Sequence, residues 1–145
     1  MEPLDLTMRP PRGPRETLAG LAFLPRTIDK LRAELPGGNM GPYLNQSDGM
    51  SAVMCKRVGL DMEELRAVVA AAPDEHAVAV WVRERVSPEI AAEASAKLAT
   101  FTMDRMPPEF QERVRKRHPV LGKRPDLNVF FDIFEADDAE AYPGI

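Results

Sequence analysis

Several features that would place a protein in a functional class are missing from this sequence. A single cysteine, Cys55, excludes a disulfide within the chain, and the two histidines do not have the spacing of metal ligands. No apolar run approaches the roughly 20 residues needed to cross a bilayer. The first residues lack the basic start and apolar middle of a signal peptide. We therefore expect a cytoplasmic protein with no metal, no cofactor and no membrane partner.

An excess of basic residues and a phosphate-binding loop are also missing. The net charge is −4, whereas a protein that grips a nucleic-acid backbone is normally basic, so we do not expect a nucleic-acid partner. Gly37-Gly38 is not followed by Lys and Ser or Thr, and no serine lies in a nucleophile-elbow pattern. Aromatic residues make up only 6% of the chain, which leaves Leu, Val, Ala and Met to fill the core.

The 145 residues fit one domain, which we divide into an extended arm over residues 1–16 and a helical body over residues 17–145. The arm is rich in proline and arginine, carries little periodic hydrophobicity and is not predicted to be helical. Cys55 lies among apolar residues, which predicts an inert, buried thiol.

The helical body shows apolar residues at helical spacing and clear start signals. Asp61 and Asp74 are suited to cap helices, Ser87-Pro88 is a strong start, and Ser47 can cap a short helix. No segment alternates convincingly as a strand. We predict an all-α fold, one irregular bundle of six or seven short helices, over residues 24–35, 48–58, 61–72, 74–86, 88–104, 108–118 and from about 126 onward.

A cluster of charged residues lies on the first long helix. Asp29 and Lys30 lie three and four residues after Arg26, so both side chains are neighbours of Arg26 on the helix surface. If Arg12 and Arg15 of the arm fold back over this surface, with Tyr43 nearby, several cations converge on a pocket suited to a phosphate or carboxylate. The alternative is a solvated surface of ion pairs without a ligand.

In the C-terminal third of the chain, basic and acidic residues are concentrated in two separate segments. Basic residues dominate residues 113–124 and acidic residues dominate residues 132–140. Either both segments are solvated, or they pair with each other within the chain or across a dimer. The basic segment lacks the interleaved aromatic residues of a nucleic-acid surface. His76 and His118 are far apart in sequence, and we interpret both as structural or surface residues.

Four segments form a distinctive set: the arm over residues 5–15, the Leu-Pro-Arg-x-x-Asp-Lys-x-Arg-Ala segment over residues 24–33, residues 81–84 and the acidic segment 131–138. With these segments the chain resembles a bacterial family of unknown function, numbered 5069 among such domains. This resemblance implies that the arm and Arg26, Asp29 and Lys30 belong to one motif set. Pro42 is a departure, since the resemblance implies a glutamate there.

Two hypotheses for the function remain. The first is a non-enzymatic binding or protein-interaction domain, and self-association as a homodimer is one version of it. The charged segments and the arginine-rich arm favour this hypothesis. The second is an enzyme or sensor for a small anionic ligand held by Arg12, Arg15, Arg26 and Lys30. No residue pattern decides whether the chain is an enzyme.

Overall fold

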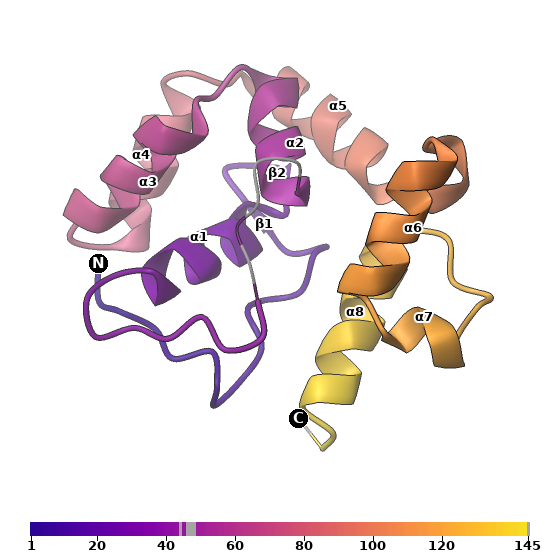
Figure 1. Ribbon diagram of the computed structural model, residues 1–145. Helices are drawn as coiled ribbons and strands as arrows, with labels where there is room; N and C mark the ends of the chain where they lie inside the picture. The colour runs from indigo at the N-terminus through magenta and orange to yellow at the C-terminus, as the bar shows by residue number, and fades with distance from the viewer. Residues whose placement is uncertain (44, 46–48, 145) are drawn as a thin grey trace.

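A computed structural model describes residues 1–43, 45 and 49–144. The fold is all-α, as predicted, with eight α-helices in these ranges rather than six or seven because a short helix follows Pro119 (Figure 1). The elements are β1 Thr17–Leu18, β2 Leu21–Ala22, α1 Leu24–Ala33, α2 Met50–Val58, α3 Met62–Ala71, α4 Glu75–Arg83, α5 Pro88–Ala99, the 3-10 helix η1 Met103–Arg105, α6 Pro108–Arg117, α7 Val120–Lys123 and α8 Phe130–Ala141.

The predicted start signals do cap helices. The Asp61 carboxylate accepts hydrogen bonds from two backbone N–H groups of α3, and Asp74 accepts one from α4. The Ser87 hydroxyl accepts one from the first turn of α5. Each cap satisfies donors that a helix start leaves without an internal partner. Ser47 lies outside the described residues, and Gly49 stands at the N-cap of α2.

Two predicted boundaries are wrong for one shared reason. Helix α5 ends at Ala99 instead of near residue 104, and α8 begins at Phe130 instead of near residue 126. The two intervening segments bond to each other through their backbones: Met103 N–H donates to Asn128 O at 2.8 Å and Phe130 N–H donates to Phe101 O at 3.0 Å. These groups are therefore not available to extend either helix.

The prediction that the chain has no strand is also wrong. Strands β1 and β2 form a short antiparallel hairpin, with Thr17 opposite Ala22 and Leu18 opposite Leu21. Ala19 and Gly20 between them both have positive φ, at 53° and 74°, as tight hairpin turns require. Two-residue strands are too short to show an alternating pattern in the sequence.

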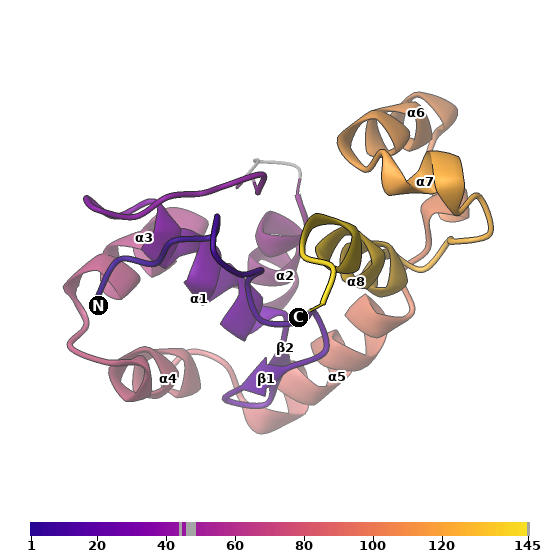
Figure 2. The ribbon, with the colours of Figure 1, turned by 90° about the horizontal axis from the view of Figure 1, so that it is seen from below.

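Helix α1 lies at the centre of the larger hydrophobic cluster, which α2 to α5 and Phe131 complete. Eight of its ten residues are buried. The N-terminal arm crosses α1 on the side seen in Figure 2. Leu6 of the arm is fully buried, and Leu4 N–H donates to Arg32 O at 3.2 Å. The arm therefore packs on the first long helix as part of the fold.

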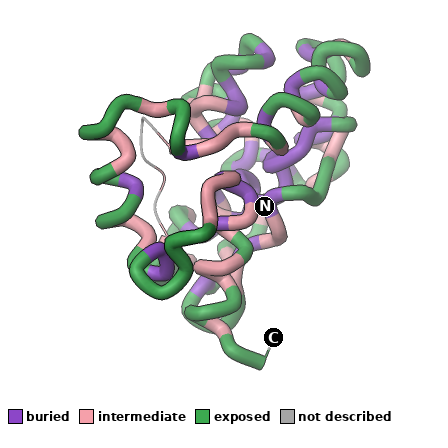
Figure 3. Tube along the Cα trace, turned by 90° about the vertical axis from the view of Figure 1, so that its right-hand side faces the viewer, coloured by how far each residue is buried: buried purple, intermediate pink, exposed green. Residues whose placement is uncertain are grey.

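A second hydrophobic cluster lies among the C-terminal helices α6, α7 and α8, which sit together on one side of the molecule (Figure 1). Met50 and Phe134 pack against both clusters. Buried and exposed stretches alternate along the helices (Figure 3), as expected where each helix presents one apolar face to a core.

Among the described residues, no helix is long and apolar enough to span a bilayer. Cys55 is buried, as predicted, and burial raises the pKa of its thiol to about 11.

Candidate functional site

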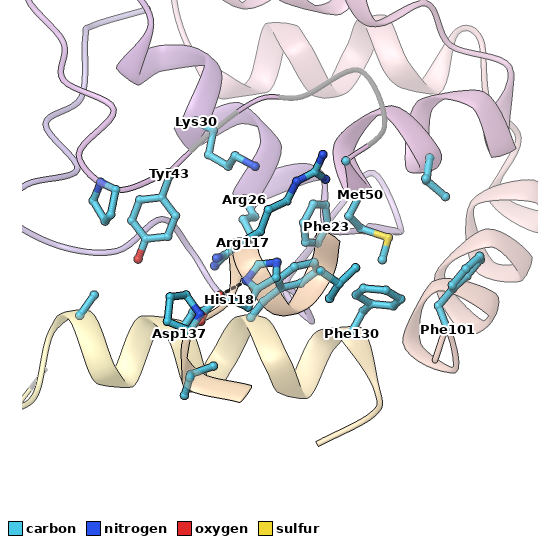
Figure 4. Close-up of a pocket in the computed structure, with 18 of the residues that line it drawn as sticks. Phe23, Arg26, Lys30, Tyr43, Met50, Phe101, Arg117, His118, Phe130 and Asp137 are labelled. Atoms are coloured by element: carbon cyan, nitrogen blue, oxygen red, sulfur yellow. Dashed lines mark hydrogen bonds and ion pairs between the residues drawn. The ribbon is translucent and has the colours of Figure 1, made fainter. Parts of the chain in front are cut away.

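The C-terminal helices face α1 and α2 across a cavity of about 520 Å³ (Figure 4). Its apolar wall is drawn from both hydrophobic clusters, so neither half of the chain could form it alone. Six aromatic rings contribute to this wall: Phe23, Tyr43, Phe101, Phe110, Phe130 and Phe134. Clefts of this volume with mainly apolar and aromatic walls are typical of small-molecule sites.

The cavity also has a charged side. Figure 4 shows Lys30 and Tyr43 on one side, with His118 and Asp137 opposite them. The first pair comes from α1 and the loop that follows it, and the second comes from the end of α6 and from α8. The ionisable side chains lining the cavity are Arg26, Lys30, Tyr43, Arg117, His118, Asp137 and Glu140.

Arg26 is buried and its charge is neutralised within the protein. Its guanidinium makes a two-pronged ion pair with Asp138 of α8, at 2.7 and 3.0 Å. It also lies 5.5 Å from the centre of the Tyr43 ring and 5.6 Å from that of Phe134. Arginine forms such planar pairs and aromatic contacts together. Arg26 therefore joins α1 to α8 and forms part of the cavity wall.

Tyr43 is fixed by the same carboxylate. Its hydroxyl donates to Asp138 Oδ1 at 2.9 Å, and its ring stacks on Tyr142 with centroids 6.5 Å apart. Burial and the Asp138 charge raise the pKa of Tyr43 above its usual value. The phenol is consequently neutral at physiological pH, and its proton is committed to Asp138.

Lys30 differs from Arg26, although the two are one helical turn apart on α1. It is half-buried, and its ammonium has no hydrogen bond or ion pair among the described residues. Burial lowers the pKa of Lys30 to about 8, with a further contribution from the Arg26 charge. The nearby carboxylates of Glu34 and Asp138 oppose this shift without reversing it. Lys30 thus presents a cation, or a neutral amine, to the cavity.

His118 and Asp137 form a contact pair on the opposite side. His118 ends α6, and its Nδ1 lies at hydrogen-bond distance from Asp137 Oδ2. The imidazole also packs against the Phe134 ring at 5.6 Å between centroids. Nε2 has no hydrogen bond within the described ranges. A carboxylate on one ring nitrogen fixes the ring and favours a proton on that nitrogen, which leaves the other to exchange protons with a ligand.

Three of the six residues predicted to form an anion site do line this cavity, namely Arg26, Lys30 and Tyr43. The other three, Arg12, Arg15 and Asp29, do not line it. The arm does fold back over α1 as expected, but its guanidinium groups bond to carboxylates of the protein.

Arg12 binds the buried Asp29 through several bonds. Its backbone N–H and its Nε donate to Asp29 Oδ2 at 2.8 and 3.1 Å, and Nη2 donates to Oδ1 at 3.0 Å. The same guanidinium reaches Glu75 of α4. Hydrogen bonds to these two carboxylates raise the pKa of Arg12, against the opposing effect of burial. Asp29 therefore orients Arg12 and fastens the arm to α1.

Arg15 is directed toward α8. It pairs with Asp132 at 2.9 Å and with Glu135, and it lies over the Phe131 ring at 5.6 Å. Farther along α8, Glu140 pairs with Lys123 of α7 at 3.1 Å. Much of the acidic C-terminal segment is thus paired within the chain.

Sequence reasoning did not find His118 and Asp137 as site residues. They are 19 positions apart and on different helices, so no local spacing connects them. The one available signal was the position of His118 before Pro119 at the end of a helix. No group of acidic, His and Cys side chains in the described part of the chain could hold a metal ion.

Comparison with known proteins adds a family but no chemistry. The model of a family described as a domain of unknown function (DUF5069) matches residues 8–140. A comparison with curated proteins found no match.

Proposed function

The chain belongs to the DUF5069 family, whose description assigns no function, and we propose from the cavity itself that the protein binds a small organic anion with an apolar, ring-like body. The observation that carries this proposal is Lys30, a cation without a protein partner among the described residues, at the edge of an aromatic cavity.

The size and the wall of the cavity select the body of the ligand. A volume of about 520 Å³ lies within the range of roughly 300–1,000 Å³ found for small-molecule pockets. Phe101, Phe110 and Phe130 offer faces and edges on which a flat apolar group can pack. A ligand that is charged along its whole length would leave this wall without a suitable partner.

The charges select the other end of the ligand. The charge of Arg26 is already neutralised by Asp138, whereas Lys30 has no such partner within the described ranges. A carboxylate, sulfonate or phosphate beside Lys30 would supply the missing counter-charge in a partly dehydrated setting. Hydrogen bonds to a charged group in such a setting stabilise by about 1.5–3 kcal/mol.

The rival hypothesis of a protein-interaction domain has less support. It depended on charged segments available to a partner, and the acidic segment forms bonds inside the chain. Arg15 pairs with Asp132 and Glu135, and Lys123 pairs with Glu140. The arm, which also supported an interaction role, is packed on α1 through Arg12 and Leu6.

A fluorescent aromatic anion tests the proposal. We expect 8-anilinonaphthalene-1-sulfonate to bind the native protein saturably, with about one molecule per chain. Lys30→Met should weaken this binding about tenfold or more, since each 1.4 kcal/mol is a factor of ten. N-phenyl-1-naphthylamine, which lacks the sulfonate, should bind both proteins alike. Fluorescence titration at pH 7 measures the binding of both dyes to the wild-type protein and to Lys30→Met.

Lys97→Met is the matched control, because Lys97 is an exposed lysine on α5 that pairs with Glu93 of the same helix. It removes the same charge from a residue that does not line the cavity and should leave the titration unchanged. Equal weakening by Lys30→Met and Lys97→Met would show only a general charge effect and would refute the proposal. Absence of saturable binding to the wild-type protein would refute it as well.

A further inference from the structure

Lys30 and His118 bring an amine and a base to the same cavity, a combination that simple anion binding does not require. Lys30 projects from α1, whose residues are largely buried, and His118 is held by Asp137 from α8 (Figure 4). The two therefore enter the same cavity from different, well-packed parts of the fold. One is an amine and the other is a base with a free ring nitrogen among the described contacts.

We propose that the cavity is a carbonyl site, in which Lys30 Nζ forms an imine with the keto group of an aryl-substituted 2-oxo acid and His118 moves the protons. This inference rests on the proposed function, because it names the class of organic anion that the cavity binds. A 2-oxo acid has its carbonyl next to its carboxylate. The charged side of the cavity that attracts the carboxylate therefore also brings the carbonyl close to the lysine.

The surroundings of Lys30 suit it to this role. An amine must lose its proton before it can attack, and a lysine becomes nucleophilic when it is desolvated in an apolar pocket or placed beside another cation. Both conditions hold here, since burial and Arg26 lower the pKa of Lys30 to about 8. At pH 7 roughly a tenth of such amines are neutral, against roughly one in 2,500 for an ordinary lysine.

The reaction balances without an oxidant or a reductant. The lone pair of the neutral amine forms an N–C bond, and the carbonyl π pair moves to oxygen. Nitrogen loses one proton and oxygen gains one, which gives a carbinolamine. The nitrogen lone pair then forms C=N as the C–O bond breaks, and the second amine proton passes to the departing oxygen, which leaves as water. The sum is one amine and one ketone giving one imine and one water.

His118 is suited to both proton transfers. It can accept the proton that nitrogen releases and return a proton to the departing oxygen, while the contact with Asp137 holds the ring in place. Asp137 is then a positioning residue, since it acts through His118. Arg117 also lines the cavity, so deprotonation of Lys30 leaves a positive side chain among the lining residues.

Reductive trapping with phenylpyruvate and cyanoborohydride tests the proposal on the full chain. Cyanoborohydride reduces an imine to a stable secondary amine, which peptide mass spectrometry locates. We expect the adduct on Lys30 to exceed that on each of the other lysines at least about tenfold. In the Lys30→Arg variant, the total amount of adduct should fall to the amount found on the other lysines of the wild-type protein.

3-Phenylpropionate separates this inference from the proposed function, since it has the ring and the carboxylate but no keto group. If it displaces 8-anilinonaphthalene-1-sulfonate while phenylpyruvate is trapped evenly over all lysines, the imine is refuted and the binding function stands. If neither acid displaces the dye, the imine is refuted because the 2-oxo acid does not enter the cavity, and the dye titration alone decides the proposed function.

His118→Gln tests the second half of the proposal. The trapping rate at saturating phenylpyruvate should fall at least about tenfold, which is modest for the loss of a general acid–base group. Asp137→Asn should slow the same step and also change its pH profile, which a purely structural contact would not do. Circular dichroism checks that both variants are folded. A His118→Gln protein that reacts at the wild-type rate would overturn the role of His118.

Discussion

Lys30 and Arg26 are one turn apart on α1 and both line the cavity, but within the described residues a carboxylate pairs with Arg26 only. Burial, together with the Arg26 charge, outweighs the nearby carboxylates of Glu34 and Asp138, which is why the pKa of Lys30 lies near 8 instead of near 10.5. Binding sites often contain such residues, since a group that is fully satisfied inside the protein has nothing left to offer a ligand. Lys30 therefore costs the empty protein some stability.

Lys30→Met should consequently stabilise the protein at pH 7. Because the folded pKa is lower than the unfolded one, the unfolded chain binds more protons between pH 8 and 10.5, and stability rises with pH in this window. The penalty is complete below about pH 8. One pKa unit corresponds to about 1.4 kcal/mol, and for a half-buried side chain we expect a gain of about 1–2 kcal/mol.

Urea denaturation at pH 7 and pH 10.5 measures this effect. The advantage of Lys30→Met over the wild type should be present at pH 7 and largely absent at pH 10.5. An unchanged free energy of unfolding at pH 7 would mean that Lys30 is well solvated, and it would also weaken the case for a reactive amine. Lys97→Met, at an exposed position, is the matched comparison.

The arm is attached to the helices by two arginines in different settings. Arg12 bonds to Asp29, whose side chain is only 1% exposed, whereas Arg15 and its partners are each almost half exposed. Removing one member of a buried pair leaves an uncompensated charge, while exposed pairs contribute little. Although the two side chains lie three residues apart, their loss should have different effects.

Arg12→Gln should therefore lower the free energy of unfolding by about 2–3 kcal/mol, and Arg15→Gln by less than about 1 kcal/mol. Chemical denaturation of the two variants provides the comparison. Raising the salt concentration should affect the wild type only slightly, since the more important pair is shielded from solvent. Equal losses in the two variants would show that the arm is fastened mainly by its apolar contacts.

At the level of elements, the sequence predicted well where a helix start carries its own chemistry. Asp61, Asp74 and Ser87 act through groups two or three residues away, so a short stretch of sequence contains the whole signal. The C-terminal end of α5 and the start of α8 depend instead on backbone hydrogen bonds between residues 101–103 and residues 128–130. Such bonds between distant segments leave no trace in either local pattern.

The same distinction explains which parts of the cavity were predicted. Arg26 and Lys30 share a helix face, and their proximity follows from the helical repeat. The partners of Arg26 and His118 are on α8, at Asp138 and Asp137, and only the packing of helices brings them together. The arm was placed correctly on α1, but its carboxylate partners could not be identified without the tertiary structure.

For the molecule as a whole, Phe134 connects two hydrophobic clusters. Its ring lies 5.5 Å from Phe23 of the larger cluster and 6.1 Å from Phe130 of the smaller one. Because both clusters contact this one side chain, we expect the wild-type protein to unfold in a single cooperative transition. Trp81 on α4 reports on the larger cluster, and far-UV circular dichroism reports on all helices.

Phe134→Ala should separate these two signals. Truncating a large aromatic side chain at such a contact costs about 3 kcal/mol, and the smaller cluster has fewer other contacts with which to offset the loss. The dichroism of the variant should begin to fall at a lower urea concentration than the Trp81 fluorescence, whereas the wild-type curves coincide. Coincident curves in the variant would show that the clusters are coupled by other residues.

The walls of the cavity come from residues 23–53 and residues 101–141, which are near opposite ends of the chain. During synthesis the early wall leaves the ribosome long before the late one. A nascent chain thus has no ligand pocket until its final helix has emerged and docked, and a product truncated before α8 never acquires one. Ligand occupancy would mark finished molecules and, by mass action, protect them preferentially from unfolding and degradation.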